Sequence, residues 1–485
     1  MESLNESAKA IGKFFREQGY TEENLPRFGL GEFSWSALGT LAASDCAFAD
    51  DPRLDLLIRL FYLGARIKAS EGEDLIPVQI LQALIACGLL ERDGDRLRPN
   101  CSLSGFGDLL LAFDARVRIE DCDPDVVFGP NPTTQLLAKS SMVCPEDNVL
   151  DLCTGCGSLA LAAALKAATV TASDLNQRAL HFGRINVALN EIRNVTFVHG
   201  DRFEPVAGRR FNTIICNPPF FLAPASGLLF SENSLELDGF VESLARNGPN
   251  FLAPGGVFQM LCEWIELESE PWVERLKRWF EGSHCDVHVW WGYEHSAAEY
   301  ARKRAFEQGQ LRPESVGISL SRRLSYFTQR RVKRIFGGLI TLRRRSGDNW
   351  FWVEEMQKRP ASFVGDALRD RFLTRDLLES KTPDILLQSH PRLVGQVCLA
   401  TESVPKNGEW QVEKTYLQRR DDLPATIILD GIVAQLVARC DGSGTVEAHL
   451  RELASEHEVA LDVIVAEGLR VIRRLADLGM ILLER

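Results

Sequence analysis

The feature that most constrains the fold is a series of short apolar runs that alternate with helical stretches between about residues 125 and 345. Continuous apolar strands between helices are typical of a parallel sheet covered on both faces. The pattern therefore predicts an α/β domain with a doubly wound, mostly parallel sheet, whose ligands bind outside the carboxyl ends of the strands. The apolar runs are NVLDL, TVTASDL, VTFVHGD, FNTIICN and GGVFQML, separated by stretches such as SLALAAALKA and NQRALHFGRINVALN.

The regions on either side have different patterns, and a chain of 485 residues is longer than one core usually serves. Residues 1–122 combine helical periodicity with a hairpin signal, LLERDGDRLRP, in which Asp93-Gly94 suits a tight turn. A helical region that ends in a hairpin predicts a winged-helix-like domain. Residues 123–345 are then the α/β domain.

Residues 346–485 are predicted to form an α+β domain with a helical, winged-helix-like end. Two strand-like runs surround Asn407-Gly408, and about sixty helical residues follow them. Ser443 and Thr445 are candidate helix caps in this last part, and the tail is a candidate strand.

The composition is that of an ordinary globular protein, with 45% hydrophobic and 25% charged residues. No apolar run has membrane-spanning length, and the N-terminus carries charges where a signal peptide needs an apolar core, so we expect a cytoplasmic protein without a membrane partner. The 12 cysteines are scattered among apolar residues, and only Cys153 and Cys156 have CxxC spacing. This usage predicts reduced thiols and no metal site.

Polar residues or glycines end four successive strands. The first strand runs into DLCTGCG, where Gly155 and Gly157 allow a tight turn and a close approach to a ligand. The second strand ends in Asp174, the third in Gly200-Asp201 and the fourth in NPPF, which begins at Asn217. These ends would line one crevice, although Asp174 alone would also suit a helix N-cap and NPP alone a strand-ending turn.

In order and spacing, these motifs resemble those of Rossmann-like S-adenosylmethionine-dependent methyltransferases. The NPPF tetrapeptide is similar to that of enzymes which methylate planar nitrogens: release-factor glutamine, ribosomal RNA guanine-N2 and adenine-N6 methyltransferases. GPNPTTQLLA upstream and FLAPGGVFQML downstream also resemble this group. The resemblance covers about residues 125–345, and the first glycine of the family's loop is Cys153 here.

The resemblance implies S-adenosylmethionine as cofactor, with the glycine loop on its methionine part, Asp174 on the ribose, and Asp201 with its neighbours on the adenine. NAD is the competing ligand of such a sheet, but hydride transfer has no use for the NPPF corner. The implied cofactor-binding residues are Asp151, Cys153, Thr154, Gly155, Gly157, Asp174, Leu175, Asp201, Arg202 and Asn217, and the implied catalytic residues are Asn217, Pro218, Pro219 and Phe220.

The corner has a chemical rationale. A planar NH₂ nitrogen is a poor nucleophile because its lone pair is delocalised. Acceptors on Asn217 and on the carbonyl of Pro218 can each take a hydrogen bond from such a group and direct its lone pair toward the methyl donor, while the prolines hold the acceptors still. Phe220 would stack on the planar group.

The motifs do not identify the substrate, since the NPPF corner recognises only a planar NH₂ group, which both glutamine and nucleobases carry. The net charge of −12 excludes a surface built for indiscriminate nucleic-acid binding, but residues 301–345 carry thirteen Lys or Arg against two Glu. This basic stretch is either a solvated surface or, with Tyr326 and Phe327 for base stacking, a nucleic-acid-binding face. Residues 221–240 are candidates for covering the site.

The sequence therefore favours methylation of a nucleobase in RNA, with a protein glutamine as the alternative. A third hypothesis, of another class, is a non-catalytic winged-helix protein that senses S-adenosylmethionine. The intact NPPF corner argues against that hypothesis, because a sensor needs the cofactor pocket but no acceptor for the reaction.

Overall fold

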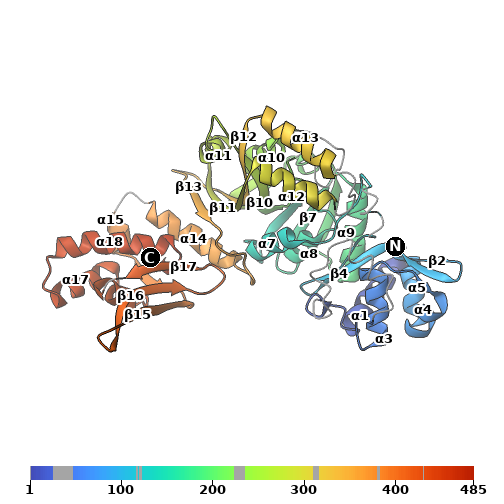
Figure 1. Ribbon diagram of the computed structural model, residues 1–485, viewed down its shortest axis with the longest axis horizontal. Helices are drawn as coiled ribbons and strands as arrows, with labels where there is room; N and C mark the ends of the chain where they lie inside the picture. The colour runs from blue at the N-terminus through green and yellow to red at the C-terminus, as the bar shows by residue number, and fades with distance from the viewer. Residues whose placement is uncertain are drawn as a thin grey trace. The chain divides into compact units, whose positions relative to one another are not determined.

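The computed structural model describes residues 2–25, 47–115, 118, 123–222, 235–309, 316–379, 383–429 and 431–484. The chain forms two compact units (Figure 1). The first comprises Met1–Ala138 and Val143–Glu355, and the second comprises Lys139–Met142 and Met356–Arg485. The division into three domains at residues 122 and 345 stays a prediction.

An eight-stranded sheet forms the centre of the first unit. Its strand order is β13-β11-β12-β10-β9-β6-β7-β8, and only β12 runs antiparallel to its neighbours. The predicted α/β class with a mostly parallel sheet is thus confirmed. The strands are β6 (Asn148–Leu152), β7 (Thr169–Asp174), β8 (Val195–His199), β9 (Phe211–Cys216), β10 (Leu252–Leu267), β11 (Cys285–Ser296), β12 (Val332–Arg344) and β13 (Phe351–Glu355).

Later strands are added on both sides of β6, and this change of direction creates a switch point in the sheet. From β6 the chain proceeds to β7 and β8 on one side and later to β9 and β10 on the other. The space between the carboxyl ends of β6 and β9 is where an open α/β sheet binds its ligand. The helices of this region are α7 (Pro132–Ser140), α8 (Ser158–Ala164), α9 (Gln177–Leu189), α10 (Gly239–Asn247), α11 (Trp272–Phe280), α12 (Ala297–Gly309) and α13 (Val316–Gln329).

The N-terminal part begins with helices and continues into a hairpin, and its winged-helix-like character stays a prediction. A helix, a short strand, two helices and a hairpin follow one another, and the strands are ordered β1-β3-β2. The hairpin turns at Gly94, whose φ of 63° suits the predicted tight turn. After α1 (Glu2–Glu17), the elements are α3 (Pro52–Leu57), the π-helical turn η3 (Ile58–Tyr62), β1 (Ile67–Lys68), α4 (Ala69–Leu75), α5 (Val78–Ala86), β2 (Leu90–Asp93) and β3 (Arg96–Pro99).

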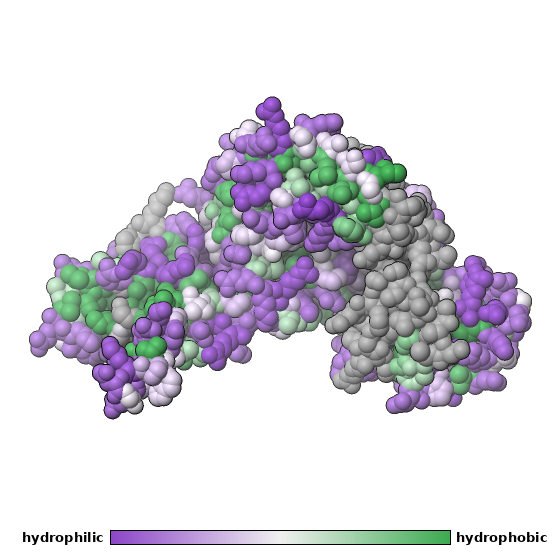
Figure 2. Space-filling model, in the orientation of Figure 1, coloured by the Kyte–Doolittle hydropathy of each residue, from purple (hydrophilic) through white to green (hydrophobic). Residues whose placement is uncertain are grey.

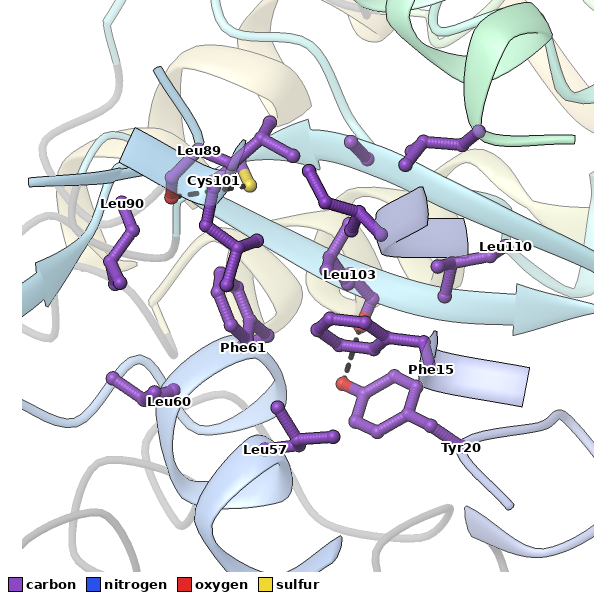
Figure 3. Close-up of a cluster of buried hydrophobic side chains, with 14 of the residues drawn as sticks. Phe15, Tyr20, Leu57, Leu60, Phe61, Leu89, Leu90, Cys101, Leu103 and Leu110 are labelled. Carbon is purple, nitrogen blue, oxygen red and sulfur yellow. Dashed lines mark hydrogen bonds between the residues drawn. The ribbon is translucent and has the colours of Figure 1, made fainter. Parts of the chain in front are cut away.

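Aromatic side chains form the centre of this N-terminal core (Figure 3). The ring of Phe15 meets Tyr20 and Phe61 edge to face, at centroid distances of 5.1 and 5.4 Å. The buried hydroxyl of Tyr20 donates to the carbonyl of Leu103 at 2.9 Å. Leu103 belongs to the hairpin of β4 (Cys101–Phe106) and β5 (Leu109–Asp114), so this core extends to the hairpin.

Asn186 of α9 and Asn190, the C-cap of the same helix, join the β4–β5 hairpin to the central sheet region. Asn186 accepts from the amide of Ala112 at 2.7 Å and donates to its carbonyl at 2.9 Å, and Asn190 binds Leu110 in the same way at 2.9 and 2.7 Å. The two side chains thereby take the place of a neighbouring strand along β5. Asn186 also donates to the carbonyl of Cys156 in the glycine loop at 2.8 Å.

The second unit contains a three-stranded sheet and a helical end. The hairpin of β15 and β16 turns at Asn407 and Gly408, whose φ values of 54° and 85° fit the predicted turn. Figure 2 shows hydrophobic residues at the surface of this unit near α18, where Leu461 and Val463 are exposed. Its elements are α14 (Gly365–Leu378), α15 (Pro383–Leu387), β14 (His390–Leu393), β15 (Val397–Lys406), β16 (Glu409–Arg419), β17 (Ala425–Leu429), α16 (Gly431–Ala438), α17 (Val446–Glu456), α18 (Leu461–Asp477) and β18 (Ile481–Glu484).

One of the two predicted caps in this unit is confirmed. The hydroxyl of Thr445 accepts from the amide of Ala448 at 3.1 Å and caps α17. Ser443 is not a cap, because its hydroxyl donates to Asp441 at 2.6 Å instead. Within the described residues, none of the helices combines the length and the apolar character that a membrane crossing requires.

Candidate active site

The polar strand ends lie along one edge of the sheet. Leu152 at the end of β6 is paired with Ser173 of β7 and with Cys216 of β9, and Asp174 is paired with His199 at the end of β8. The glycine loop, Asp174, Asp201 and the NPPF corner therefore all leave the sheet at the same edge.

Asp151 occupies the buried end of β6. The hydroxyl of Thr154 donates to its Oδ2 at 2.5 Å, and its Oδ1 is buried without a hydrogen-bond partner. Burial raises the pKa of Asp151 from 3.8 to about 7, and the hydrogen bond from Thr154 opposes the rise. A buried carboxylate oxygen without a donor is a suitable partner for a positively charged group.

The glycine loop has the backbone conformation that glycine favours at three positions. Cys153, Gly155 and Gly157 have φ values of 60°, 55° and 88°. A non-glycine residue at positive φ is uncommon, which gives a physical reason why the related family has glycine at the position of Cys153. A side chain at Gly155 would meet nothing within 4 Å, so the loop leaves open space there.

Asp174 holds the loop through its carboxylate. Its Oδ2 accepts from the amide of Gly155 and its Oδ1 from the amide of Asn176, both at 2.8 Å. Burial raises the pKa of the Asp174 carboxyl, and these amide hydrogen bonds oppose the rise. Asn176, not Asp174, is the N-cap of α9, so the helix-cap interpretation of Asp174 is wrong.

The remaining predicted cofactor residues lie farther out. Asp201 accepts from the guanidinium of Arg202 at 2.8 Å, and both side chains are partly exposed. Leu175 is also exposed, and its carbonyl lies 2.9 Å from the ring nitrogen Nε2 of His199. An exposed apolar side chain after β7 and two polar ones after β8, at the same edge of the sheet, suit a planar ring with polar edges.

The side-chain amide of Asn217 is oriented by α7. Its Nδ2 donates to the hydroxyl of Thr134 at 3.3 Å. That hydroxyl in turn donates to Oδ1 of Asn131 at 3.1 Å. Because the Thr134 proton is directed to Asn131, the hydroxyl presents a lone pair to Asn217. The amide nitrogen must therefore face Thr134, and Oδ1 of Asn217 is left buried without a partner.

The rest of the corner is rigid and largely buried. Pro218 and Phe220 are buried, and the Phe220 ring meets Phe221 edge to face at 5.1 Å. Burial, followed by the neighbouring thiol of Cys153, raises the pKa of Cys216. The roles of the individual site residues stay predictions.

The sequence did not identify Thr134. GPNPTTQLLA was recognised as part of the resemblance, but nothing in the sequence indicates that its second threonine reaches a strand end that lies 83 residues further along the chain. The candidate covering segment, residues 221–240, lies outside the described residues at positions 223–234.

The basic stretch does not form a free cationic face. Phe327 is 1% exposed, so the expectation that it stacks on bases is wrong, and the ring of Tyr326 lies 4.1 Å from the Arg330 guanidinium. Arg344 donates to the carbonyl of Leu252 at 3.0 Å. Six of the other described cations pair with carboxylates of the same unit: Arg304 with Glu263, Arg330 with Glu236, Lys333 and Arg334 with Glu266, and Arg343 and Arg345 with Asp286.

The fold and this site define the class: the central region is an S-adenosylmethionine-dependent methyltransferase domain. Residues 129–278 match the family described as "Methyltransferase small domain". Residues 17–100 match a family described only as a domain of unknown function, DUF7059.

Known proteins resemble the same region. A ribosomal protein uL3 glutamine methyltransferase of Bradyrhizobium diazoefficiens is 34% identical over 159 residues, 30% of this chain and 50% of that protein. A release factor glutamine methyltransferase of Buchnera aphidicola is 30% identical over 166 residues, 30% of this chain and 56% of the relative. The chain thus spans about half the length of these relatives.

Solved structures align more loosely. A 16S rRNA N2 G1207 methyltransferase of Thermus thermophilus, solved with S-adenosylmethionine and guanosine, is 17% identical, covers 50% of this chain and 66% of its own, and has a TM-score of 0.28. At this level of similarity the alignment carries no argument about the substrate.

The residues present fit S-adenosylmethionine. The orphaned Oδ1 of Asp151 suits the positive charge of the cofactor, and the open space at Gly155 leaves room beside it. The Asp174 carboxylate, although it already accepts two amides, keeps lone pairs for hydroxyl donors.

Proposed function

We propose that this protein is an S-adenosylmethionine-dependent N-methyltransferase that methylates the side-chain amide nitrogen of a protein glutamine. The observation that carries the proposal is the buried, unpartnered Oδ1 of Asn217 at the carboxyl end of β9. A buried acceptor without a donor is costly, by about 1–3 kcal/mol. A substrate NH₂ group that enters the site would satisfy it.

The chemistry follows from the fixed orientation of that acceptor. When bound, S-adenosylmethionine supplies a methyl group activated by a sulfonium centre. Asn217 accepts one N–H of the substrate amide through Oδ1, and the carbonyl of Pro218 accepts the other. With both protons held in the plane of the amide, the nitrogen lone pair, which is perpendicular to that plane, would face the methyl group. The N–C bond would form as the S–C bond breaks and the thioether leaves, and the methylated nitrogen would then lose one proton to water. The residues of the corner contribute by positioning the amide.

Two observations support a glutamine over a nucleobase. Relatives that are 34% and 30% identical over this domain carry the names of glutamine methyltransferases. In addition, six cations of the basic stretch, on which the expectation of RNA rests, are paired with carboxylates, as with Lys333 and Glu266 at 2.8 Å. A neutralised cation releases few counterions from a polyphosphate, so this stretch adds little to RNA affinity.

The test is transfer of tritium from methyl-labelled S-adenosylmethionine to the protein and RNA fractions of an extract from cells that lack this enzyme. We expect label in protein, and acid hydrolysis should release it as volatile methylamine, because hydrolysis of an N-methylated glutamine gives glutamate and methylamine. Asn217→Ala serves as the inactive control, and Asn212→Ala, at the other end of β9, as the matched active control.

Each other outcome overturns part of the proposal. Label that is removed by ribonuclease would replace glutamine by a nucleobase. Binding of S-adenosylmethionine without transfer to either fraction would favour the non-catalytic sensor. The salt dependence of RNA binding gives a second check: a steep log–log slope that falls by about 0.7–0.9 per lost contact when Arg330, Arg331, Lys333 and Arg334 become Ala would restore the RNA hypothesis.

A further inference from the structure

We infer that Tyr300 and Arg323 are positioning residues for methyl transfer, because they fix the main chain directly behind the NPPF corner, Tyr300 as part of a buried network centred on Glu263. The inference rests on the proposed function and adds residues to it that lie outside the methyltransferase motifs. Tyr300 belongs to α12, Arg323 to α13 and Glu263 to β10.

The main chain of Leu222 is held on both sides. Its amide donates to the hydroxyl of Tyr300 at 3.1 Å, and its carbonyl accepts from Nη1 of Arg323, also at 3.1 Å. The Leu222 side chain is 1% exposed and belongs to a small core cluster that includes Tyr300, Phe327 and Ile335. Both polar groups and the side chain of this residue are thus fixed by α12, α13 and β12.

The preceding residue is held through its ring. The guanidinium carbon of Arg304 lies 3.6 Å from the ring centroid of Phe221, which is a close cation–π contact. Nη2 of the same guanidinium donates to Oε1 of Glu263 at 2.6 Å, so Arg304 is itself fixed in position.

Glu263 is the common anchor of Tyr300 and Arg304. Its carboxylate is fully buried and accepts from the hydroxyl of Tyr293 at 2.5 Å, from the hydroxyl of Tyr300 and from Arg304. On β10, Met260 is the last residue paired with β9, opposite Cys216. Glu263 therefore lies beyond the end of β9, at the level where the chain turns into the corner.

Stability alone does not explain so many polar groups at this position. A buried ion pair rarely stabilises a fold more than apolar side chains of the same volume, because desolvation offsets the attraction. What such a network does provide is a defined geometry, since each donor and acceptor has one suitable partner. Here the geometry that it defines is that of residues 221 and 222.

The consequence for the reaction is that the corner is fixed at both ends. Upstream, Cys216 is paired in the sheet, and downstream, Leu222 is anchored on Tyr300 and Arg323. Asn217 and Pro218 lie between these two points. A displacement of about 1 Å in a reacting geometry can lower a rate about a hundredfold, so loss of the downstream anchor should lower kcat.

The test compares Tyr300→Phe with Tyr293→Phe. Both changes remove one hydroxyl donor from Glu263, but only Tyr300→Phe also leaves the Leu222 amide without an acceptor. The first readout needs no substrate: hydrogen–deuterium exchange of the peptide 217–222. We expect exchange of the Leu222 amide to become at least about tenfold faster in Tyr300→Phe and to stay unchanged in Tyr293→Phe.

The second readout is the kinetics of tritium transfer to the protein fraction described above. We expect kcat to fall about tenfold in Tyr300→Phe and less than about twofold in Tyr293→Phe, with the calorimetric affinity for S-adenosylmethionine unchanged in both. If Tyr300→Phe does not fold, Arg323→Met, which removes the donor to the Leu222 carbonyl, takes its place.

Unchanged exchange, or an equal fall of kcat in the two variants, would overturn the inference while the proposed function stands. The same holds for a fall in cofactor affinity that parallels the fall in rate, because the network would then act on the whole site. If the wild-type enzyme transfers no label to either fraction, the proposed function fails, and the inference fails with it.

Discussion

The two halves of the site are fixed in different ways. The glycine loop is held by groups close to it in sequence, as in the hydrogen bond from the Gly155 amide to Asp174, which spans 19 residues. The NPPF corner is held by residues that are distant in sequence: Thr134, which orients Asn217, is 83 residues away from it, and Arg323, which holds Leu222, is 101 residues away.

The difference assigns separate properties to the two halves. A loop fixed by its neighbouring strand forms with the sheet and determines how well the cofactor binds. A corner fixed by side chains of distant helices depends on the packing of the whole unit, and its geometry enters the rate more than the affinity. Variants of the loop should thus change the affinity for S-adenosylmethionine, and variants around the corner should change kcat.

The largest expected effect is that of Asn217→Ala on the corner. Removing one preorganised acceptor of the transition state typically lowers the rate about a hundred- to a thousandfold. We expect single-turnover transfer to fall by this factor, while the calorimetric affinity for S-adenosylmethionine changes less than about threefold. Asn212→Ala should match the wild type. Transfer by Asn217→Ala at a near-normal rate would contradict the role of the acceptor.

Asp174→Ala tests the loop in the same way. Loss of hydrogen bonds to a charged acceptor costs about 1.5–3 kcal/mol, which corresponds to a roughly ten- to hundredfold weaker affinity for S-adenosylmethionine. The value of kcat at saturating cofactor should change little. Glu204→Ala, an exposed carboxylate near the same sheet edge, should bind the cofactor normally. A large loss of kcat with normal cofactor affinity in Asp174→Ala would contradict the proposed difference between the glycine loop and the NPPF corner.

The pH dependence of cofactor binding sharpens the comparison at Asp151. Its pKa in the folded protein, about 7, lies above the unfolded value of 3.8, so the carboxyl becomes ionised only as the pH rises through about 7. The free energy of unfolding of the free protein should accordingly decrease as the pH rises from 3.8 to about 7, because over this range the unfolded chain has lost the Asp151 proton and the folded protein still holds it.

A cationic cofactor needs the ionised form, so its affinity should increase about tenfold from pH 6 to pH 8, in line with the ionised fraction. Titration calorimetry at several pH values measures this increase. Asp151→Asn cannot ionise and should bind weakly without this pH dependence. An increase of the same size in Asp151→Asn would assign it to another group.

The smallest effect is expected at Thr134, the partner of the Asn217 amide. Thr134→Val removes a single hydrogen bond and should lower kcat about two- to tenfold, the equivalent of about 0.5–1.5 kcal/mol, at unchanged affinity for S-adenosylmethionine. Thr134→Ser keeps the hydroxyl and should retain most of the rate. Equal losses in both variants would indicate that the methyl group, not the hydroxyl, supports the corner.

The strands and the cofactor loop could be predicted because their signals are local. Four of the five apolar runs of the central region became strands at nearly the same residues, as with β6 at Asn148–Leu152, since a continuous apolar run has few other ways to be buried. The fifth, GGVFQML, lies within the longer β10 at Leu252–Leu267. The turns at Gly94 and at Asn407-Gly408 follow in the same way from residues that tolerate positive φ.

The surroundings of the corner could not be predicted, because hydrogen-bond and ion-pair partners are chosen by packing. In the sequence alone, the cations of residues 301–345 suggest a phosphate-binding face. In the structure, Glu263, Glu266 and Asp286 lie beside several of them and pair with them. Phe327 is suited to base stacking by residue type, but the fold uses it as core.

The sequence by itself thus determined the class of the sheet, five of its strands and the edge at which their polar ends lie, because backbone preferences and apolar periodicity act over a few residues. Only the tertiary structure decided which way the Asn217 amide faces and what holds Leu222 behind it. Both depend on side chains that meet across 78 to 101 residues, and a contact over such a separation exists only once the whole unit has packed.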